Sequence, residues 1–474
     1  MNAPISSLLA NFAIENRDRG VPDPVGEKVS AHLLDVLGVQ LAASRQDFAE
    51  AVRVVARGLG GPPQAIALGV EERIGAPNAA LLNGTLAHGV DYDDTHLRSI
   101  VHPSATVSPA ALAVGEEVDA DGKALFAAMA VGLETAIRIG LSAEGEFHDR
   151  GFHATPIAGV FGATLAAGML YRHGPDQLIS SLGLAASMAG GLLEFLSDGS
   201  SAKRLHGGWA AHSGVLAARL GGAGFTGPAG GLDGRFGLLP TLFGDAADPS
   251  RIGRDLGDVW EMLDIALKPY PNCHFVHAFL DIASSLREEM GLVAGRSASL
   301  EDLDNIDFIE CGVVPLTIDV VCEPRATKLR PQTPYDAQFS LPFSVALMMA
   351  RGRVTLSEYE PASIADESLI ALATKVRVVP EENPNFPASF PGRLRLVLRD
   401  GRTFEATVNK NRGGPGAELG AEEIRAKFRA NAIPSLGEGQ VERIVEVFSA
   451  AARPGARKIM AGFASDSSES EASK

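Results

Sequence analysis

The chain has 474 residues and a formal net charge of −16, with 46% hydrophobic and 21% charged residues, as in an ordinary globular protein. This acidic balance argues against nucleic acid as a partner, because phosphate binding needs a basic surface. The three cysteines, Cys273, Cys311 and Cys322, contain no CxxC pair. They therefore argue against a disulfide framework and an iron–sulfur cluster, and they fit a reducing cytosol.

The amino-terminal segment predicts neither export nor a membrane anchor. Its first 20 residues lack a basic region followed by a long apolar run, so they do not resemble a signal peptide. The most apolar stretch, TPIAGVFGATLAAGML (155–170), is shorter than the roughly 20 residues that a membrane span needs. We therefore expect a cytoplasmic protein with no membrane partner.

Helical periodicity dominates residues 5–265. Residues 29–44 place Leu33, Val36, Leu37 and Leu41 on one stripe, as an amphipathic helix requires. In the segment 153–174, Thr155 is the expected N-cap, Pro156 the first helical residue and Gly174 the stop. A second helix should follow at once as its antiparallel partner. The abundance of Ala and Gly predicts closely packed helices with small residues at their contacts.

The pattern changes near residue 270. DFIECGVVPLTIDVVC (307–322) is rich in β-branched residues and predicts strands, and SLPFSVALMMARG (340–352) predicts a helix. GRLRLVLRDGRTFEATV (392–408) alternates apolar and polar residues around Asp400-Gly401, which predicts a hairpin. Helical pattern returns over 420–452.

These patterns predict a mainly α protein with four parts. They are the first part of a helical domain (1–268), a smaller α+β domain (269–408), the second part of the helical domain (409–462), and a disordered acidic tail (463–474).

The segment NGTLAHGVDYDDTHLRSIVHPSATVSPA (83–110) concentrates ionisable residues. On a helix, Gly84, His88, Asp91 and Thr95 would share one face. A metal site would use His88 and Asp91, but the complementary HExxH or carboxylate set is missing. A prenyl-diphosphate site of the form DDxxD fails because Leu97 occupies its last position. The remaining alternatives are a substrate site and a solvated helix face with capping aspartates.

Four further ionisable side chains are expected at, or just before, helix N-termini: His102, His153, Lys203 and His274. Arg204 follows Lys203 in the same first turn, and Asn272 is the expected N-cap before His274. A cation there opposes the helix dipole by roughly 0.3–1 kcal/mol, yet it suits a bound anion. If these helix starts converge, they form a pocket for a carboxylate-bearing molecule, lined by histidines that move protons near neutral pH.

Several motifs together resemble the MmgE/PrpD family. They are NGTLAHGVDYDDTH, HPSATVSPAALAVGE, GLETAIRIG, GFHATPIAGVFGA, SAKRLHGGWAAHSG, KPYPNCHFVHAFLD and AQFSLPFSVAL, in this order over residues 5–450. The family contains 2-methylcitrate dehydratase, cis-aconitate decarboxylase and iminodisuccinate epimerase. The dehydratase members tend to carry a WGHPSDN-like segment where this chain has IVHPSAT, which argues against methylcitrate as the substrate.

The resemblance implies a large all-helical domain built from both chain ends, with a smaller α+β lid inserted and the active site between them. It also implies a homodimer and no required metal or organic cofactor. Carried over by motif, the functional residues are Asp91, Thr95, His102, His153, Lys203 and His274.

We therefore expect a lyase, either a dehydratase or a decarboxylase, that acts beside a carboxylate of a small di- or tricarboxylate. His102, His153, Lys203 and Asp91 are the expected catalytic residues, and Thr95, His274 and Arg204 are expected to bind substrate. An epimerase of a dicarboxylate such as iminodisuccinate is the second possibility, and a non-catalytic carboxylate-binding protein is the third.

Overall fold

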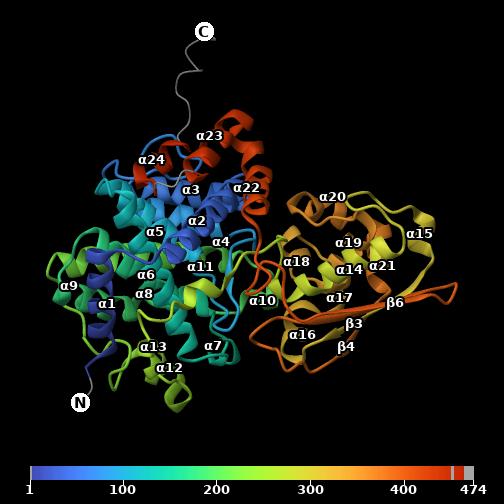
Figure 1. The fold of residues 1–474 in the computed structure, drawn as a ribbon, viewed down its shortest axis with the longest axis horizontal. Coiled ribbons are helices and arrows are strands. Elements are labelled where there is room, and N and C mark those ends of the chain that lie inside the picture. The colour runs from blue at the N-terminus through green and yellow to red at the C-terminus, as the bar shows by residue number, and fades with distance from the viewer. Residues whose placement is uncertain (1–2, 450–452, 464–474) are drawn as a thin grey trace, which may run out of the picture. The chain divides into compact units, whose positions relative to one another are not determined.

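The computed structural model describes residues 3–449 and 453–463 of the chain (Figure 1). The chain divides into two compact units. The larger unit comprises Met1–Gly89, Asp93–Ile265 and Gly420–Lys474, and the smaller comprises Val90–Tyr92 and Ala266–Leu419. The predicted mainly α class, with a helical part from both chain ends and a smaller α+β part, is confirmed. The predicted disordered tail lies outside the described residues, except for Phe463.

The larger unit is built almost wholly from helices. In chain order its elements are α1 (Ile5–Arg19), α2 (Asp23–Ala43), α3 (Phe48–Gly58), α4 (Ala76–His88), β1 (Thr95–His96), α5 (Ser104–Glu117), α6 (Gly122–Leu141), α7 (Glu146–Asp149), α8 (Ala154–Leu170), α9 (Pro175–Met188), α10 (Phe195–Asp198), α11 (Ala202–Gly222), α12 (Leu238–Phe243), α13 (Ser250–Gly253), α22 (Ala421–Leu436), α23 (Glu438–Ser449) and α24 (Ala456–Ala461). Short 3₁₀ turns cover Gly244–Ala246 and Glu261–Asp264, and β2 (Ile265–Ala266) lies at the boundary.

The centre of this unit is a stack of helices in near backbone contact. A Cβ added at Gly162 of α8 would lie 2.4 Å from the carbonyl oxygen of Gly132 on α6. Every residue of α8 is buried, so the apolar stretch 155–170 is a core helix. By length and composition α6 is also apolar enough to cross a membrane, yet 94% of its most apolar window is buried inside the structure. The prediction of small residues at helix contacts is confirmed.

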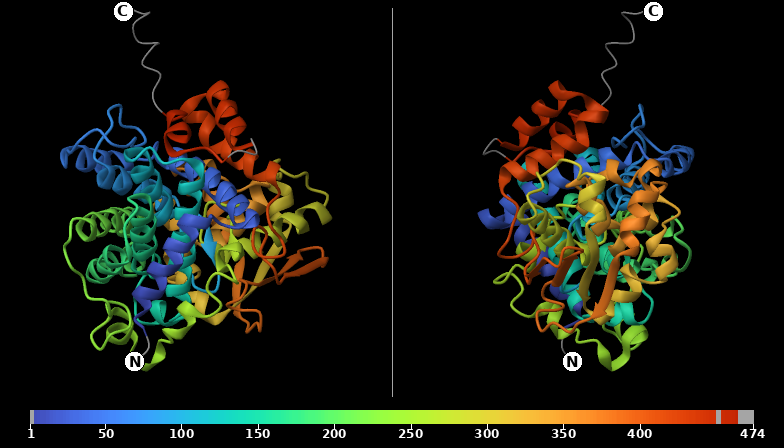
Figure 2. Two further views of the ribbon diagram at one scale, coloured as in Figure 1. Left: turned by 60° about the vertical axis from the view of Figure 1, so that its left-hand side comes forward. Right: turned by 90° about the vertical axis from the view of Figure 1, so that its right-hand side faces the viewer.

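The carboxy-terminal helices complete the core that the amino-terminal helices begin. Figure 2 shows them, in red, beside the blue amino-terminal helices, and α22 packs against α2. Lys427 of α22 forms an ion pair of 2.8 Å with Asp35 of α2, and both side chains are buried. Leu33, Val36, Leu37 and Leu41, the predicted stripe of α2, are all buried.

The smaller unit combines a sheet with short helices. Its elements after Val90–Tyr92 are a 3₁₀ turn (His274–Val276), α14 (His277–Glu289), α15 (Leu300–Asp304), β3 (Ile306–Val313), α16 (Pro315–Val321), α17 (Arg325–Leu329), α18 (Pro334–Gln338), α19 (Leu341–Arg351), a second 3₁₀ turn (Leu356–Tyr359), α20 (Pro361–Ile364), α21 (Glu367–Thr374), β4 (Val376–Pro380), β5 (Gly392–Leu398) and β6 (Thr403–Val408).

The sheet has the strand order β4-β3-β5-β6, in which β3 pairs parallel to β4 and antiparallel to β5. The predicted hairpin is confirmed, since β5 and β6 pair from Gly392 opposite Val408 to Val397 opposite Thr403. Alternate residues of β5 are buried, as in a sheet with one covered face. The prediction that 307–322 is all strand is wrong, because Pro315 starts helix α16, where a missing N–H costs nothing.

Candidate active site

The ionisable segment begins where α4 ends. Helix α4 stops at His88, and Asp91 follows with a φ of 51°. The prediction of one helical face through Gly84, His88, Asp91 and Thr95 is therefore wrong. Position 89, the C-cap of α4, requires glycine, because a Cβ there would lie 2.2 Å from the ring of Phe48. An aspartate tolerates the left-handed conformation better than most residues, so the chain turns at Asp91.

The adjacent carboxylates of Asp93 and Asp94 each hold a buried histidine. Asp93 lies 2.7 Å from Nδ1 of His88, and Asp94 lies 2.5 Å from Nδ1 of His32. Asp94 also accepts from the backbone N–H and the hydroxyl of Ser104, the first residue of α5. These bonds fix the loop between α4 and α5 to α2, to the end of α4 and to the start of α5.

His102 is held in one tautomer. Its Nδ1 lies 2.7 Å from the carbonyl oxygen of Asp94, which only accepts, so Nδ1 carries a proton. In the neutral ring Nε2 is then the basic nitrogen. Thr95 places its hydroxyl 3.1 Å from the same Nδ1, and the backbone N–H of His102 donates to the hydroxyl of Thr155 at 3.0 Å. The structure thus brings Thr95 and His102 together.

His153, and not Thr155, precedes α8 as its N-cap, so that prediction is wrong. Pro156 becomes the third helical residue, where its missing N–H is still one of the unpaired first-turn positions. The backbone N–H of His153 donates to the carbonyl of Gly191 at 3.0 Å. Its ring stacks on His88, with centroids 5.3 Å apart, and lies 6.2 Å from the ring of His102.

Lys203 and two further histidines complete this cluster. As predicted, Lys203 lies in the first turn of α11, and it is buried. Nδ1 of His206, one turn further along α11, lies 2.9 Å from Nδ1 of His153, and the ring of His148 lies 6.4 Å from that of His153. We call His88, His102, His148, His153, His206 and Lys203 the histidine cluster.

Three rings of the cluster, His148, His153 and His206, have lowered pKa values. Burial lowers the pKa of His153 well below its usual value, and the charges of His88, His206, Lys203 and His102 lower it further. Burial, and then His88 and Lys203, lower the pKa of His206 to about 3. Burial and Lys203 lower the pKa of His148 to about 4. These rings therefore present neutral nitrogens beside a buried lysine.

Glycines let the two helices that carry the cluster meet. A Cβ at Gly84 of α4 would lie 2.7 Å from Cα of Gly208 on α11, and one at Gly208 would lie 2.1 Å from the carbonyl oxygen of Leu81. Gly207 faces His88 directly, since its added Cβ would lie 3.0 Å from Cβ of His88. The end of α4 and the start of α11 are thus fixed in register, which places His88 beside the Lys203 turn.

Asp91 belongs to the smaller unit. Nζ of Lys268 donates to the backbone oxygen of Asp91 at 2.9 Å and lies 3.2 Å from its carboxylate, and both side chains are buried. Gln338 donates to the carbonyl of Val90 at 2.9 Å, and Tyr92 donates to that of Pro269 at 3.2 Å. Sequence reasoning missed Lys268 as a functional candidate, although it opens the KPYP motif that carried the family resemblance.

His274 is also in the smaller unit, at the start of a 3₁₀ turn. The prediction that Asn272 caps this turn is wrong, because its side chain instead donates to the hydroxyl of Tyr359 at 2.8 Å. The ring of His274 is buried and lies 4.4 Å from that of His277 and 5.4 Å from that of Phe390.

Arg204 occupies a different environment from its neighbour Lys203. Its guanidinium lies over the ring of Phe48, 4.5 Å from the centroid, and lines a surface pocket with Leu205 and Val55. Of the predicted residues, the structure therefore groups Thr95, His102, His153 and Lys203 in the larger unit. His148 and His206 were missed. His206 had a usable signal in its spacing of three from Lys203, whereas His148 had none.

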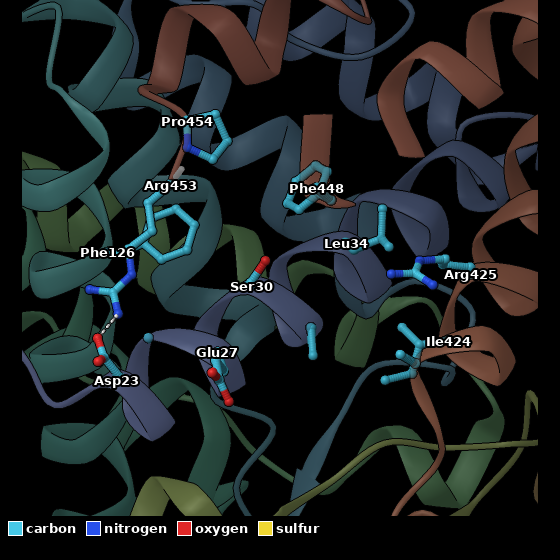
Figure 3. A pocket seen from close by; sticks show the side chains of 13 residues that line it. Asp23, Glu27, Ser30, Leu34, Phe126, Ile424, Arg425, Phe448, Arg453 and Pro454 are labelled. Carbon is cyan, nitrogen blue, oxygen red and sulfur yellow. Dashed lines mark hydrogen bonds and ion pairs between the residues drawn. The ribbon is translucent and has the colours of Figure 1, made fainter. Parts of the chain in front are cut away.

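Three other features, a surface pocket, possible metal ligands and the cysteines, offer less support for a reaction centre than the histidine cluster does. A pocket of ≈ 470 Å³ lies between α2, α6 and the carboxy-terminal helices, where Asp23 pairs with Arg453 at 3.1 Å (Figure 3). The described residues that line it include no histidine. Among residues 3–449 and 453–463, no group of three or more His, Cys, Asp or Glu side chains is arranged to hold a metal ion. Cys273, Cys311 and Cys322 are buried, and none of the three is in a disulfide of the described structure.

Comparison with known proteins covers almost the whole chain. Residues 7–250 match the model of the MmgE/PrpD N-terminal domain, and residues 270–451 match that of the C-terminal domain. A cis-aconitate decarboxylase-like protein of Aspergillus oryzae is 25% identical over 93% of each chain. A cis-aconitate decarboxylase of Aspergillus terreus is 24% identical over 94% of this chain and 92% of its own. The cis-aconitate decarboxylase of Homo sapiens is 27% identical over 78% of this chain and 75% of its own.

Proposed function

The chain belongs to the MmgE/PrpD family, and from this premise we propose that it is a lyase that removes carbon dioxide from a small tricarboxylate of the cis-aconitate type. The observation that carries the proposal is the histidine cluster, in which the rings of His148, His153 and His206, whose pKa values are lowered, lie near the buried Lys203. The names of the curated relatives support decarboxylation over dehydration.

Lys203 is the proposed anchor for substrate charge. When the bond to the departing carboxylate breaks, its electron pair stays on carbon and delocalises into a neighbouring carboxylate as an enolate. A cation placed where this charge develops stabilises the transition state, and it acts more strongly in a buried site than in water. Lys203 is such a cation in a buried site. It also lies at the start of α11, whose first N–H groups favour an anion.

The carbon left by carbon dioxide must then take up a proton. We assign this step to His153, because its ring is close to Lys203 and to His102. His102 is the proposed second proton-transfer group, since its Nδ1 proton is committed to the carbonyl of Asp94 and Nε2 is the basic nitrogen; decarboxylation requires no base, whereas in an epimerase Nε2 would accept the α-proton of the substrate. The roles of Asp91, Thr95, His274 and Arg204 in catalysis or binding stay predictions.

An epimerase is the second candidate. Such an enzyme needs two proton-transfer groups, and the rings of His102 and His153, 6.2 Å apart, meet that requirement. The first experiment is proton NMR of the purified protein in D2O with cis-aconitate, 2-methylcitrate, citrate and iminodisuccinate. We expect loss of carbon dioxide with one deuterium in the product. Deuterium at an α-carbon without elimination would establish the epimerase instead, and binding without turnover would establish a non-catalytic protein.

Replacing Lys203 with alanine tests the anchor. We expect kcat/KM to fall by about 10²–10³-fold, the usual cost of losing one charge-stabilising group, while the midpoint of thermal unfolding stays within a few degrees. Lys123 is the matched control, because it is the second residue of α6 as Lys203 is of α11, but it is exposed. Full activity in Lys203→Ala, or an equal loss in Lys123→Ala, would contradict the assignment.

A further inference from the structure

The contact between His153 and His206 joins two nitrogens of the same kind. The two Nδ1 atoms lie 2.9 Å apart, so one proton must lie between them, donated by one ring and accepted by the other. The tautomer of each ring is therefore tied to that of its neighbour. If His153 donates, its Nε2 is free of hydrogen, and His206 holds its own proton on Nε2.

The side chains nearest to this pair are histidines and a lysine, and no carboxylate is bonded to either ring of the pair in the described residues. The groups that face it are His88 from α4, His102 before α5, His148 of α7 and Lys203 of α11. Asp93, the nearby acid, lies 2.7 Å from Nδ1 of His88 and 3.8 Å from Nδ1 of His102. In the part of the chain that the structure describes, no ion pair joins either His153 or His206 to a carboxylate. His153 is buried, whereas His206 is partly exposed.

A bound polycarboxylate would change whether the His153–His206 pair favours a further proton. Burial and the positive charges of neighbouring groups lower the pKa values of His153 and His206, so they disfavour a further proton on the pair. Two or three substrate carboxylates beside Lys203 would favour that proton. We propose that His206 is a positioning residue that accepts the Nδ1 proton of His153, and that the pair takes up one proton when a polycarboxylate binds. This inference rests on the proposed function.

The proton balance of the reaction is consistent with this role. Water or buffer acid supplies a proton that forms a new N–H bond at Nε2 of His153, which makes His153 an imidazolium bonded through Nδ1 to neutral His206. When the carbon–carboxylate bond breaks, the electron pair left on carbon takes the Nε2 proton. The pair returns to neutral, and overall R–CO2⁻ and H⁺ give R–H and CO2. The proton bound with the substrate is the proton found in the product.

Calorimetry of binding tests the uptake directly. The probe is tricarballylate, a saturated tricarboxylate that cannot lose carbon dioxide by this route, titrated at pH 7.5 in phosphate and in Tris. Because these buffers differ in ionisation enthalpy, the difference in observed heat counts the protons exchanged. We expect an uptake of about one proton per site in the unaltered protein. Tricarballylate binding without proton uptake would overturn the inference and leave the proposed function standing. Failure of tricarballylate and cis-aconitate to bind would overturn both.

Variants of His206 separate positioning from folding. His206→Phe removes the acceptor and should lose most of the uptake, lower kcat by about 10²-fold and move the pH at which activity declines on the acid side. His206→Asn keeps an oxygen that can accept the Nδ1 proton of His153, and it should restore much of the proton uptake and of kcat. His212→Asn is the matched control, since His212 is on the same helix, where its Nδ1 bonds to the carbonyl of Pro77 at 2.9 Å. Unchanged uptake in His206→Phe, or an equal loss in His212→Asn, would refute the role.

Discussion

Asp93 and Asp94 are neighbours in the chain, yet each carboxylate holds a different buried imidazole, one from α4 and one from α2. The sequence suggested that these aspartates cap a helix, and Asp94 does accept the first N–H of α5, at Ser104. Their histidine partners were beyond prediction. His32 is 62 residues away from Asp94, and helical periodicity reports only on neighbours within a turn or two.

Histidines whose pKa values are lowered by burial or partial burial make stability depend on pH. Burial lowers the pKa of His96 to about 3, that of His148 to about 4 and that of His206 to about 3. In the unfolded chain these rings titrate near pH 6.5, so below that pH the unfolded state binds more protons than the folded state. Their contribution to stability is therefore complete above about pH 6.5 and is lost as the pH falls towards 3–4.

We expect the free energy of unfolding in urea to fall between pH 7 and pH 5, by about 1.4 kcal/mol per pH unit for each such ring well below pH 6.5. His148→Gln removes one of these rings, so its slope against pH should be shallower by about one proton. A variant with the slope of the unaltered protein would show that His148 titrates alike in both states.

At the scale of single elements, sequence patterns predicted helices and the hairpin better than they predicted where helices start and stop. At the end of α4, the glycine at position 89 is required by the ring of Phe48, a residue 41 positions earlier, which fills the space beside it. The helix α16 had β-branched residues that favoured a strand, and only the proline at its first position marked the change. Such boundaries are decided by tertiary contacts that local propensity does not contain.

The contact between α4 and α11 gives a prediction at this scale. Gly208→Ala places a methyl group where the carbonyl of Leu81 stands, and backbone cannot yield as a flexible side chain can. We expect a loss of about 3 kcal/mol or more, with lower activity because Lys203 and His88 shift apart. Gly58→Ala at the end of α3, where nothing lies within 4 Å of the added carbon, should be neutral or slightly stabilising. Denaturation curves that rank the two variants equally would contradict this packing.

For the whole molecule, the helical unit is complete only when the distant end of the chain returns. Amphipathic patterns predicted helix over 420–452, and the family resemblance implied that it joins the amino-terminal helices. Neither source identified the partners. Asp35 and Lys427, almost 400 residues apart, form a buried ion pair, and burial raises the pKa of Asp35 while Lys427 opposes that rise. The sequence around Asp35 does not indicate which distant residue forms its ion pair.

Breaking this pair tests how much α22 contributes. Lys427→Ala leaves the carboxylate of Asp35 buried without its lysine, and we expect a loss of about 3–5 kcal/mol in the free energy of unfolding. Adding Asp35→Asn should recover part of that loss, because the amide carries no charge to bury. The full double-mutant cycle in urea measures the coupling. Additive losses from the two single changes would mean that the pair does not join α22 to α2.

The glycine contact between α4 and α11 also bears on how such a protein can diverge. Positions 84, 207 and 208 lie where α4 and α11 meet, and any side chain there would meet backbone or the base of His88. On the outer face of the same helix, Leu205 and Trp209 are exposed and have room to change. The short distance between the two helix backbones therefore disfavours substitution of these glycines. A side chain on the outer face can therefore change without moving the two helices, whereas a side chain at any of these three glycines cannot.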